Sequence, residues 1–128
     1  MNHRSGWIKV VLLAVSMSIL ASGPVRAADA AGKTATIKGY VVDSACAFVK
    51  NLKKPVSADC AVACAKAGSP LVVLTQAGAI YWPISDATPA TGQNQRLMEY
   101  AGKMVSVTGK VFDKGGSHAI VIEKIEAK

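Results

Sequence analysis

The 128-residue sequence predicts a mainly β fold of the α+β class, formed by one domain behind an N-terminal leader. Three observations support this prediction. Five short segments are rich in β-branched residues or alternate between apolar and polar residues, as strands do. Two further stretches have helical features, and the first of them contains two of the three cysteines. Gly, Pro and Asp residues separate these segments, where turns are expected.

The first 27 residues predict a secretory signal peptide that precedes the fold. Basic residues lead into an apolar run over 8–20, and a Ser-Gly-Pro sequence then interrupts any helix. Residues 25–27 supply the small side chains that a signal peptidase recognises, so cleavage is expected after Ala27. The longest apolar stretch, 10–21, is too short to cross about 30 Å of hydrocarbon. We therefore expect a periplasmic or secreted protein that does not span a membrane after cleavage.

Much of the positive charge belongs to that leader. The chain has 15 basic and 8 acidic residues, and removing the leader's three basic residues leaves 12 and 8, a net charge of +4. Lys50, Lys53 and Lys54 form the one basic cluster that remains, which is typical of a solvated loop. No nucleic-acid partner is expected, since the chain has 5% aromatic residues and no basic track. Phosphate-loop, dinucleotide and zinc-protease motifs are absent.

The folded part is expected to begin after a small, polar and flexible leader over 28–35, and to form a single domain over 36–128. A first strand is predicted over 36–43, with Ile37 and Val41 on one face. The stretch that follows is rich in alanine and contains the cysteines.

A helix is expected over 58–67 in this stretch. Ser57 suits the N-cap, Asp59 suits the positive end of the helix, and Gly68 suits the position after the C-cap. Asp43 is interpreted as the cap of another turn, three residues before Cys46.

The rest of the chain predicts two hairpins with a helix between them. The sequence Gln-Ala-Gly suits a three-residue hairpin loop, and Asp-Lys-Gly-Gly suits a tight turn. The expected elements are strands over 71–75 and 79–83, a helix over 93–101, and strands over 103–111 and 117–125. Alternation with polar neighbours predicts that Val105, Val107, Val111, Ile120 and Ile122 face the core.

Five strands with a helix between the third and the fourth have the order of an OB-fold, a partly open five-stranded Greek-key barrel. Here the Cys-bearing helix is inserted between strands one and two. The alternative is a small α+β sandwich with both helices on one face of an open sheet. About 100 residues are enough to bury a core of either kind.

Three segments resemble a group of small exported bacterial proteins of unknown function with an OB-like fold. These segments are 39–46 (GYVVDSAC), the pair Cys60 and Cys64, and 101–109 (AGKMVSVTG). The group shares an aromatic-x-x-Asp-x-x-Cys sequence, a CxxxC helix and an AGxxVxVTG strand. The resemblance covers most of the chain after the leader. It implies the fold and export, and it assigns no activity.

Cys46, Cys60 and Cys64 are the main candidates for a functional site. In an oxidising compartment cysteines are expected to pair, and an odd count leaves at least one thiol outside any internal bridge. Cys60 and Cys64 share a helix face at a spacing of four, with Cβ atoms about 5–6 Å apart, which is too far for a disulfide between them. Both are therefore expected to meet a third group, either the Cys46 sulfur or a metal ion.

Three interpretations of the cysteines stay open. The first is a structural disulfide from Cys46 to Cys60, with Cys64 as the alternative partner. The second is a site for copper or zinc formed by Cys46, Cys60, Cys64 and His118. The third is thiol–disulfide exchange, with Cys60 activated at the helix N-terminus.

Two aromatic residues form a second candidate site. Tyr81 and Trp82 lie on the third predicted strand and are candidates for a ligand-binding platform, or they pack at an edge. No pair of carboxylates and no Ser-His-acid arrangement supports catalysis. We therefore expect an exported binding or interaction module stapled by a disulfide, whose partner is a small ligand or an envelope protein, rather than an enzyme. Metal binding and redox exchange are the alternatives.

Overall fold

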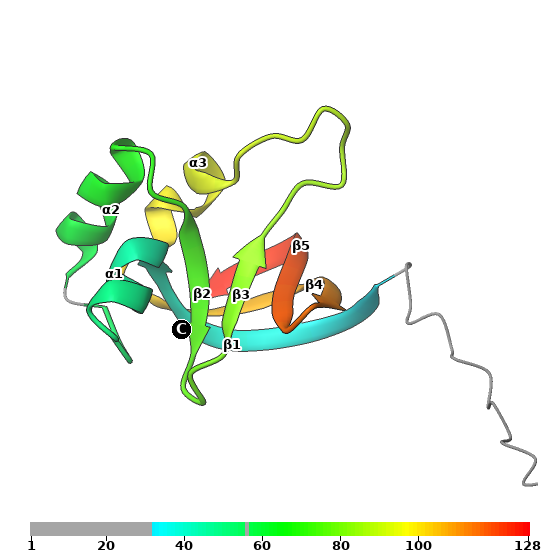
Figure 1. The fold of residues 1–128 in the computed structure, drawn as a ribbon, viewed down its shortest axis with the longest axis horizontal. Coiled ribbons are helices and arrows are strands. Elements are labelled where there is room, and N and C mark those ends of the chain that lie inside the picture. Colours follow the sequence, from blue (N-terminus) through cyan, green and yellow to red (C-terminus); the bar gives the residue numbers. More distant parts are fainter. Residues whose placement is uncertain (1–31, 56) are drawn as a thin grey trace, which may run out of the picture.

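A computed structural model describes residues 32–55 and 57–128, which form a small β-barrel with helices gathered at one end (Figure 1). The strands close in the order β1-β2-β3-β5-β4, with β1 bonded to both β2 and β4. The strands are β1 (Lys33–Asp43), β2 (Leu71–Thr75), β3 (Ile80–Pro83), β4 (Met104–Lys114) and β5 (Ser117–Ala127). The helices are α1 (Ser44–Val49), α2 (Ala58–Lys66), α3 (Asn94–Leu97) and the 3₁₀ helix η1 (Met98–Tyr100).

The architecture confirms the predicted OB-like α+β barrel. All neighbouring strands are antiparallel except β3 and β5, which pair in parallel through Tyr81–Pro83 and His118–Ile120. That parallel pairing closes the barrel, so the expectation of a partly open barrel is corrected. The closure involves only part of the long strands, since β1 pairs with β2 over Gly39–Asp43 and β5 pairs with β3 over His118–Ile120.

Several predicted boundaries differ from those observed. β1 begins at Lys33, so the leader expected over 28–35 is too long, because Thr34–Thr36 already pair with β4. The second predicted helix divides into α3 and η1. Cys46 lies on a helix of its own, α1, which the sequence interpretation did not include. The expected signal peptide lies outside the described residues.

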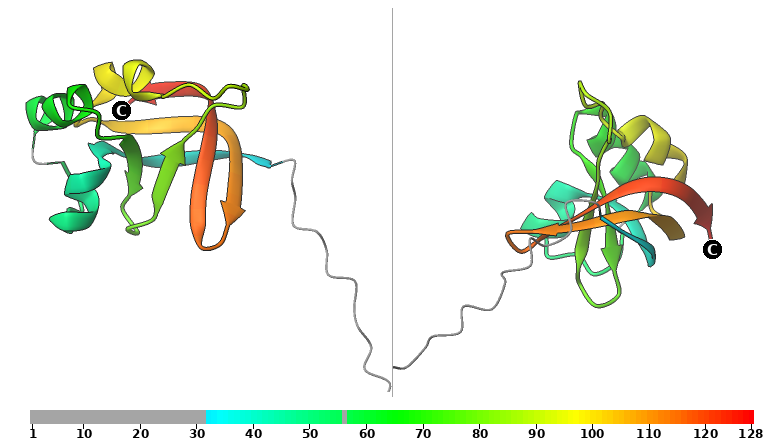
Figure 2. Two further views of the ribbon diagram at one scale, coloured as in Figure 1. Left: turned by 45° about the horizontal axis from the view of Figure 1, so that its top comes forward. Right: turned by 90° about the vertical axis from the view of Figure 1, so that its right-hand side faces the viewer.

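The barrel interior is apolar and is closed at one end by helices. Its core comprises strand residues together with Ala61 and Ala65 of α2, Leu97 of α3, and Ala101. The predicted inward residues are confirmed: Val105, Val107, Ile120 and Ile122 are buried, and Val111 packs against them. Figure 2 shows the helices grouped at one end of the crossed strands. The folded core therefore fixes the position of α2.

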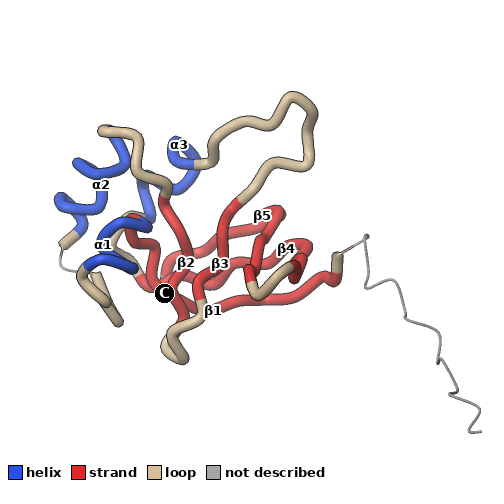
Figure 3. Tube along the Cα trace, in the orientation of Figure 1, coloured by secondary structure: helices blue, strands red, loops and turns tan. Residues whose placement is uncertain are grey.

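A second apolar cluster lies between the strands and α1. It comprises Val42 of β1, Ala47 of α1, and Val72 and Leu74 of β2. Val42 follows Val41 on β1, and successive strand residues point to opposite faces of a sheet. This cluster is thus on the outside of the barrel, where α1 covers β1 and β2. In Figure 3 the helices α1 and α2 lie side by side next to the same end of the strands.

Two glycines allow strands to approach closely. A Cβ atom on Gly109 would lie 2.0 Å from the Val121 carbonyl oxygen, and one on Gly39 would lie 2.5 Å from the Leu74 carbonyl oxygen. Gly109 is at the register shift between β4 and β5, where the pairing slips by one residue. The extra residue of this β-bulge is Glu123, so the bulge bends β5 where it crosses Gly109 of β4.

None of the helices described here has the length and apolar character needed to cross a membrane.

Candidate thiol site

Helix α1 places Cys46 directly after the end of β1. Asp43 is its N-cap, and the carboxylate accepts a hydrogen bond from the Cys46 backbone N–H at 3.0 Å. The Ser44 N–H donates to the Pro70 carbonyl at 2.8 Å, which ties the start of the helix to the chain that enters β2. The interpretation of Asp43 as a cap is confirmed. Cys46 therefore sits in the first turn of a helix that is anchored at the barrel surface.

Helix α2 places Cys60 and Cys64 one turn apart. Ser57 caps the helix by accepting a hydrogen bond from the Cys60 N–H at 3.0 Å. At the other end the Ser69 N–H donates to the Cys64 carbonyl, and Gly68 adopts a positive φ of 102°. This is a Schellman arrangement, which satisfies the last carbonyls of the helix. The start and end predicted for this helix are both confirmed to within one residue.

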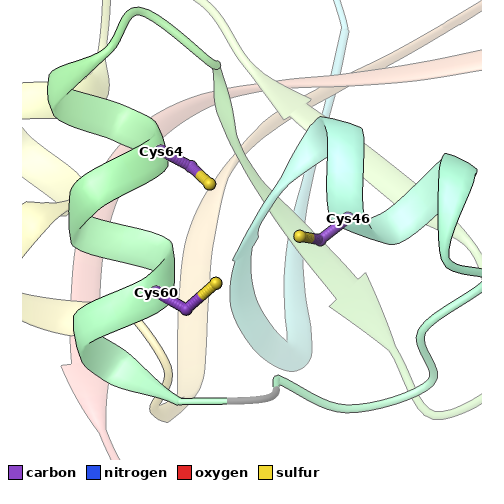
Figure 4. Close-up of side chains that lie close together, drawn as sticks. All are labelled: Cys46, Cys60 and Cys64. Carbon is purple, nitrogen blue, oxygen red and sulfur yellow. The ribbon is translucent and has the colours of Figure 1, made fainter.

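The two helices bring the three thiols together. The sulfur atoms of Cys46, Cys60 and Cys64 all lie within 4.8 Å of one another. Cys46 is buried and the other two are half-buried. Figure 4 shows Cys60 and Cys64 pointing from α2 toward Cys46 on α1. As their spacing predicts, both cysteines of α2 lie close to a third group, which is the Cys46 sulfur.

All three cysteines are free thiols in this structure. The expected bridge from Cys46 to Cys60 is therefore not formed here. The geometry favours neither a Cys46–Cys60 nor a Cys46–Cys64 bridge, because the Cys46 sulfur is close to both sulfurs of α2.

A buried carboxylate lies beside the thiols. Asp43 is 2% exposed and also accepts a hydrogen bond from the Ser69 hydroxyl at 3.4 Å. Its hydrogen-bonding contact with the Cys46 thiol, together with burial, raises the pKa of that thiol from 9.0 to about 11. Burial and the same carboxylate also raise the pKa of the Cys64 thiol. In the absence of a cation, the site therefore favours neutral thiols at these two positions.

A small cavity adjoins the thiols. Its volume is about 10 Å³, and its lining includes Asp43, Cys46, Leu52, Pro55 and Cys60. A space of this size admits about one water molecule. The cysteine site is therefore compact and has no room for an organic ligand of ordinary size.

Three clustered thiols suit a soft metal ion. Metal–thiolate bonds are about 2.3 Å long for zinc, so sulfurs around one ion lie about 4 Å apart. Sulfurs within 4.8 Å of one another reach that arrangement through small rotations of their side chains. A disulfide instead requires two sulfurs to approach to about 2.05 Å, which leaves the third sulfur alone.

His118 does not join the cysteines. The group of clustered ligand atoms found among the described residues contains the three sulfurs and no histidine. His118 lies on β5, where its Nδ1 contacts the Asp113 carboxylate and its ring stacks on Tyr81, with ring centroids 5.1 Å apart. The expectation that His118 converges on the thiols is corrected. The strand register holds it opposite Tyr81 on β3.

Tyr81 and Trp82 do not form one platform. As successive residues of a strand they point to opposite faces. Tyr81 packs against the barrel core, whereas Trp82 packs against the outer cluster and stacks on Phe48 of α1, with centroids 6.2 Å apart. Both rings are packed, as the alternative predicted, although β3 is paired with both β2 and β5 rather than lying at an edge. Trp82 joins α1 to the barrel.

The sequence interpretation missed α1, although one signal for it was present. Asp43 and Cys46 have the spacing of an N-cap and the residue whose N–H it accepts. The six-residue length gave too little periodicity to predict a helix. The Phe48–Trp82 contact joins segments more than 30 residues apart, so no local pattern indicated it.

Comparisons with protein-family models, curated proteins and solved structures found no match to this chain. The site is therefore defined by its own geometry, as a cluster of three thiols on an OB-like barrel.

Proposed function

We propose that this protein binds a soft metal ion, copper(I) in preference to zinc(II), and that it does so after export. The observation that supports this function is the approach of three thiol sulfurs to within 4.8 Å of one another. Soft thiolate ligands select copper(I) and zinc among the common metals. The resemblance to exported proteins and the signal-like sequence of residues 1–27 support the location.

The number of ligands favours copper(I). Structural zinc sites have four protein ligands, and the cluster among the described residues offers three. His118, the fourth ligand suggested by the sequence, is held elsewhere by Asp113 and Tyr81. A site limited to three thiolates suits an ion that accepts a lower coordination number.

The electrostatics of the site also favour a cation. The buried Asp43 carboxylate lies beside Cys46, and metal binding would replace thiol protons with a positive ion that this carboxylate stabilises. The raised pKa of Cys46 and Cys64 means that binding releases protons. Uptake should therefore be weaker at low pH.

A disulfide-stapled binding module is the second candidate function. The same proximity of the sulfurs favours it, because Cys46 is near both possible partners in what we propose is an oxidising compartment. The staple would join α1 to α2 and leave one thiol unpaired. A role as a thiol–disulfide enzyme is less favoured, since a raised pKa depletes the thiolate at Cys46 and Cys64.

Anaerobic titration of the reduced protein with copper(I) against a competing chelator tests the proposal. We expect one ion per chain, and we expect zinc to bind more weakly. Cys46→Ser, Cys60→Ser and Cys64→Ser should each lower the copper(I) affinity by at least about 100-fold, because loss of a ligand should cost more than the roughly 10- to 100-fold loss caused by removing a hydrogen-bond partner of a ligand. His118→Gln is the matched control and should leave the affinity unchanged.

Two results would contradict the metal site. One is a reduced protein that binds copper(I) no more tightly than the Cys46→Ser variant. The other is exported protein that contains a stable internal disulfide and one free thiol, shown by intact mass before and after alkylation. That second outcome would support the stapled module.

A further inference from the structure

Residues 48–54, which comprise the end of α1 and the first part of its connection to α2, have an unusual surface. At the end of α1 the side chains of Phe48 and Val49 are 60% and 85% exposed, although both are large and apolar. Three exposed lysines, Lys50, Lys53 and Lys54, follow within five residues. An apolar centre with a charged rim is the usual anatomy of a protein–protein contact surface.

This segment is part of the wall of the thiol site. Leu52 lines the small cavity together with Cys46 and Cys60, and so does Pro55, which directly follows the segment. The Lys50 N–H donates to the Cys46 carbonyl at 3.2 Å, which places Lys50 one helical turn beyond that cysteine. A molecule that covers residues 48–54 would therefore lie directly beside the thiols.

Residues 48–54 carry three positive charges and no acidic residue. In the part of the chain that the structure describes, Lys50, Lys53 and Lys54 take part in no ion pair. Asp59, in the first turn of α2, is the next acidic residue along the chain. An excess of cations on one surface attracts acidic partners and speeds their association.

The apolar part of the surface is held in place. Phe48 stacks on Trp82 of β3 with ring centroids 6.2 Å apart and planes inclined by 22°. Trp82 in turn packs against the outer cluster of β1, β2 and α1. An aromatic side chain that is already ordered loses little conformational entropy when a partner covers it.

We propose that residues 48–54 form the docking surface for an acidic protein that exchanges the soft metal ion with Cys46, Cys60 and Cys64. This proposal rests on the proposed function, because it assigns the partner that reaches the same site. Phe48 and Val49 supply the apolar centre, and the three lysines steer an acidic donor to the thiols.

Metal-transfer kinetics test the docking surface with two defined donors. One is a Glu-rich peptide that carries a single Cys-x-x-Cys pair loaded with copper(I), and the other has Lys at every Glu position. Transfer from the acidic peptide to the purified protein should be at least about 10-fold faster at low salt, within the range of electrostatic steering. The advantage should shrink as ionic strength shortens the screening length.

Three variants locate the effect. The triple change Lys50→Glu, Lys53→Glu and Lys54→Glu should abolish the preference for the acidic donor. The control triple Lys38→Glu, Lys110→Glu and Lys114→Glu changes the net charge equally at exposed strand positions and should retain most of it. Phe48→Ala should slow transfer from the acidic peptide while leaving the equilibrium copper(I) affinity unchanged.

The outcomes separate this proposal from the metal site itself. Normal copper(I) affinity with equal transfer from both peptides, or equal losses in the two triple variants, would overturn the docking surface alone. Absence of copper(I) binding at equilibrium would overturn the proposed function. The salt dependence of transfer to the unmodified protein requires no variant, so a triple variant that fails to fold still leaves a decisive measurement.

Discussion

The barrel and the segment between β1 and β2 differ in what their residues do. In the barrel core, the buried residues are aliphatic. The side chains of β4 and β5 point alternately inward and outward, and one β-bulge interrupts the pairing of these two strands. The β1–β2 segment clusters three thiols beside a buried acid, Asp43, which is the last residue of β1. The barrel supplies stability and position, and the segment carries the reactive groups. This division resembles that of many binding proteins, in which a rigid scaffold presents functional loops.

The two regions pack together through side chains of α1 and α2. Ala61 and Ala65 of α2 enter the barrel core, while Ala47 of α1 packs on the outside. Changes in the barrel should therefore alter stability and leave metal affinity intact, whereas changes in the segment should alter metal affinity.

The largest effect on stability is expected from Gly109→Ala. The new Cβ would lie 2.0 Å from the Val121 carbonyl oxygen, which is backbone and cannot rotate away. We expect a loss of at least about 3 kcal/mol in urea unfolding, because overpacking at backbone is not relieved by side-chain movement. Gly92→Ala is the control, since a Cβ there meets nothing within 4 Å. Similar stability of the two variants would show that β4 and β5 are farther apart than described.

A smaller loss is expected from Val107→Ala. Val107 is fully buried in the barrel core, so its truncation leaves a cavity and should cost about 1–3 kcal/mol. The neighbouring Thr108 points outward, where its hydroxyl bonds that of Thr36 at 2.8 Å. Thr108→Ala should therefore cost at most about 1 kcal/mol. Chemical denaturation measures both, and equal losses would show that the strand register is wrong.

Ser57→Ala tests the segment rather than the barrel. It removes the side-chain acceptor for the Cys60 N–H and should cost about 1 kcal/mol, the usual value of an N-cap. Because the cap orders the turn that carries Cys60, copper(I) affinity should fall as well. Ser57→Asn retains a capping side chain and should preserve both properties. A fall in stability with unchanged metal affinity would show that the Ser57 N-cap stabilises the helix but does not position Cys60 for metal binding.

A further expected effect is a pH dependence of the reduced, metal-free protein. Its folded state holds the Cys46 proton more tightly than the unfolded chain, since the pKa is raised from 9.0 to about 11. The stabilisation from this thiol is thus complete below about pH 9 and is lost as the pH rises to about 11. Urea unfolding at about pH 8 and about pH 10.5 should show a larger decline for the unmodified protein than for Cys46→Ala. Equal declines would contradict the raised pKa.

The sequence predicted the barrel better than the site. Alternation identified the inward face of β4 and β5, and Ser57 and Gly68 marked the ends of α2, because these signals are local. The spacing of Cys60 and Cys64 also predicted a shared third group, which the position of Cys46 confirms.

The errors have a common cause in contacts between distant segments. His118 was placed near the thiols from the order of elements alone, but pairing between β3 and β5 holds it against Tyr81. Barrel closure depends on the same parallel pairing, which no local pattern indicates. Helix α1 is stabilised by its packing on β1 and β2 rather than by a long periodic sequence.

X-ray absorption spectroscopy of the copper(I)-loaded protein tests the metal site most directly, because it counts and identifies the atoms bound to the ion. The sulfurs of Cys46, Cys60 and Cys64 lie within 4.8 Å of one another, so we predict three sulfur neighbours and no nitrogen neighbour. The spectrum of His118→Gln should be identical. A first shell with two sulfurs, or with nitrogen that disappears in His118→Gln, would contradict the three-thiolate site.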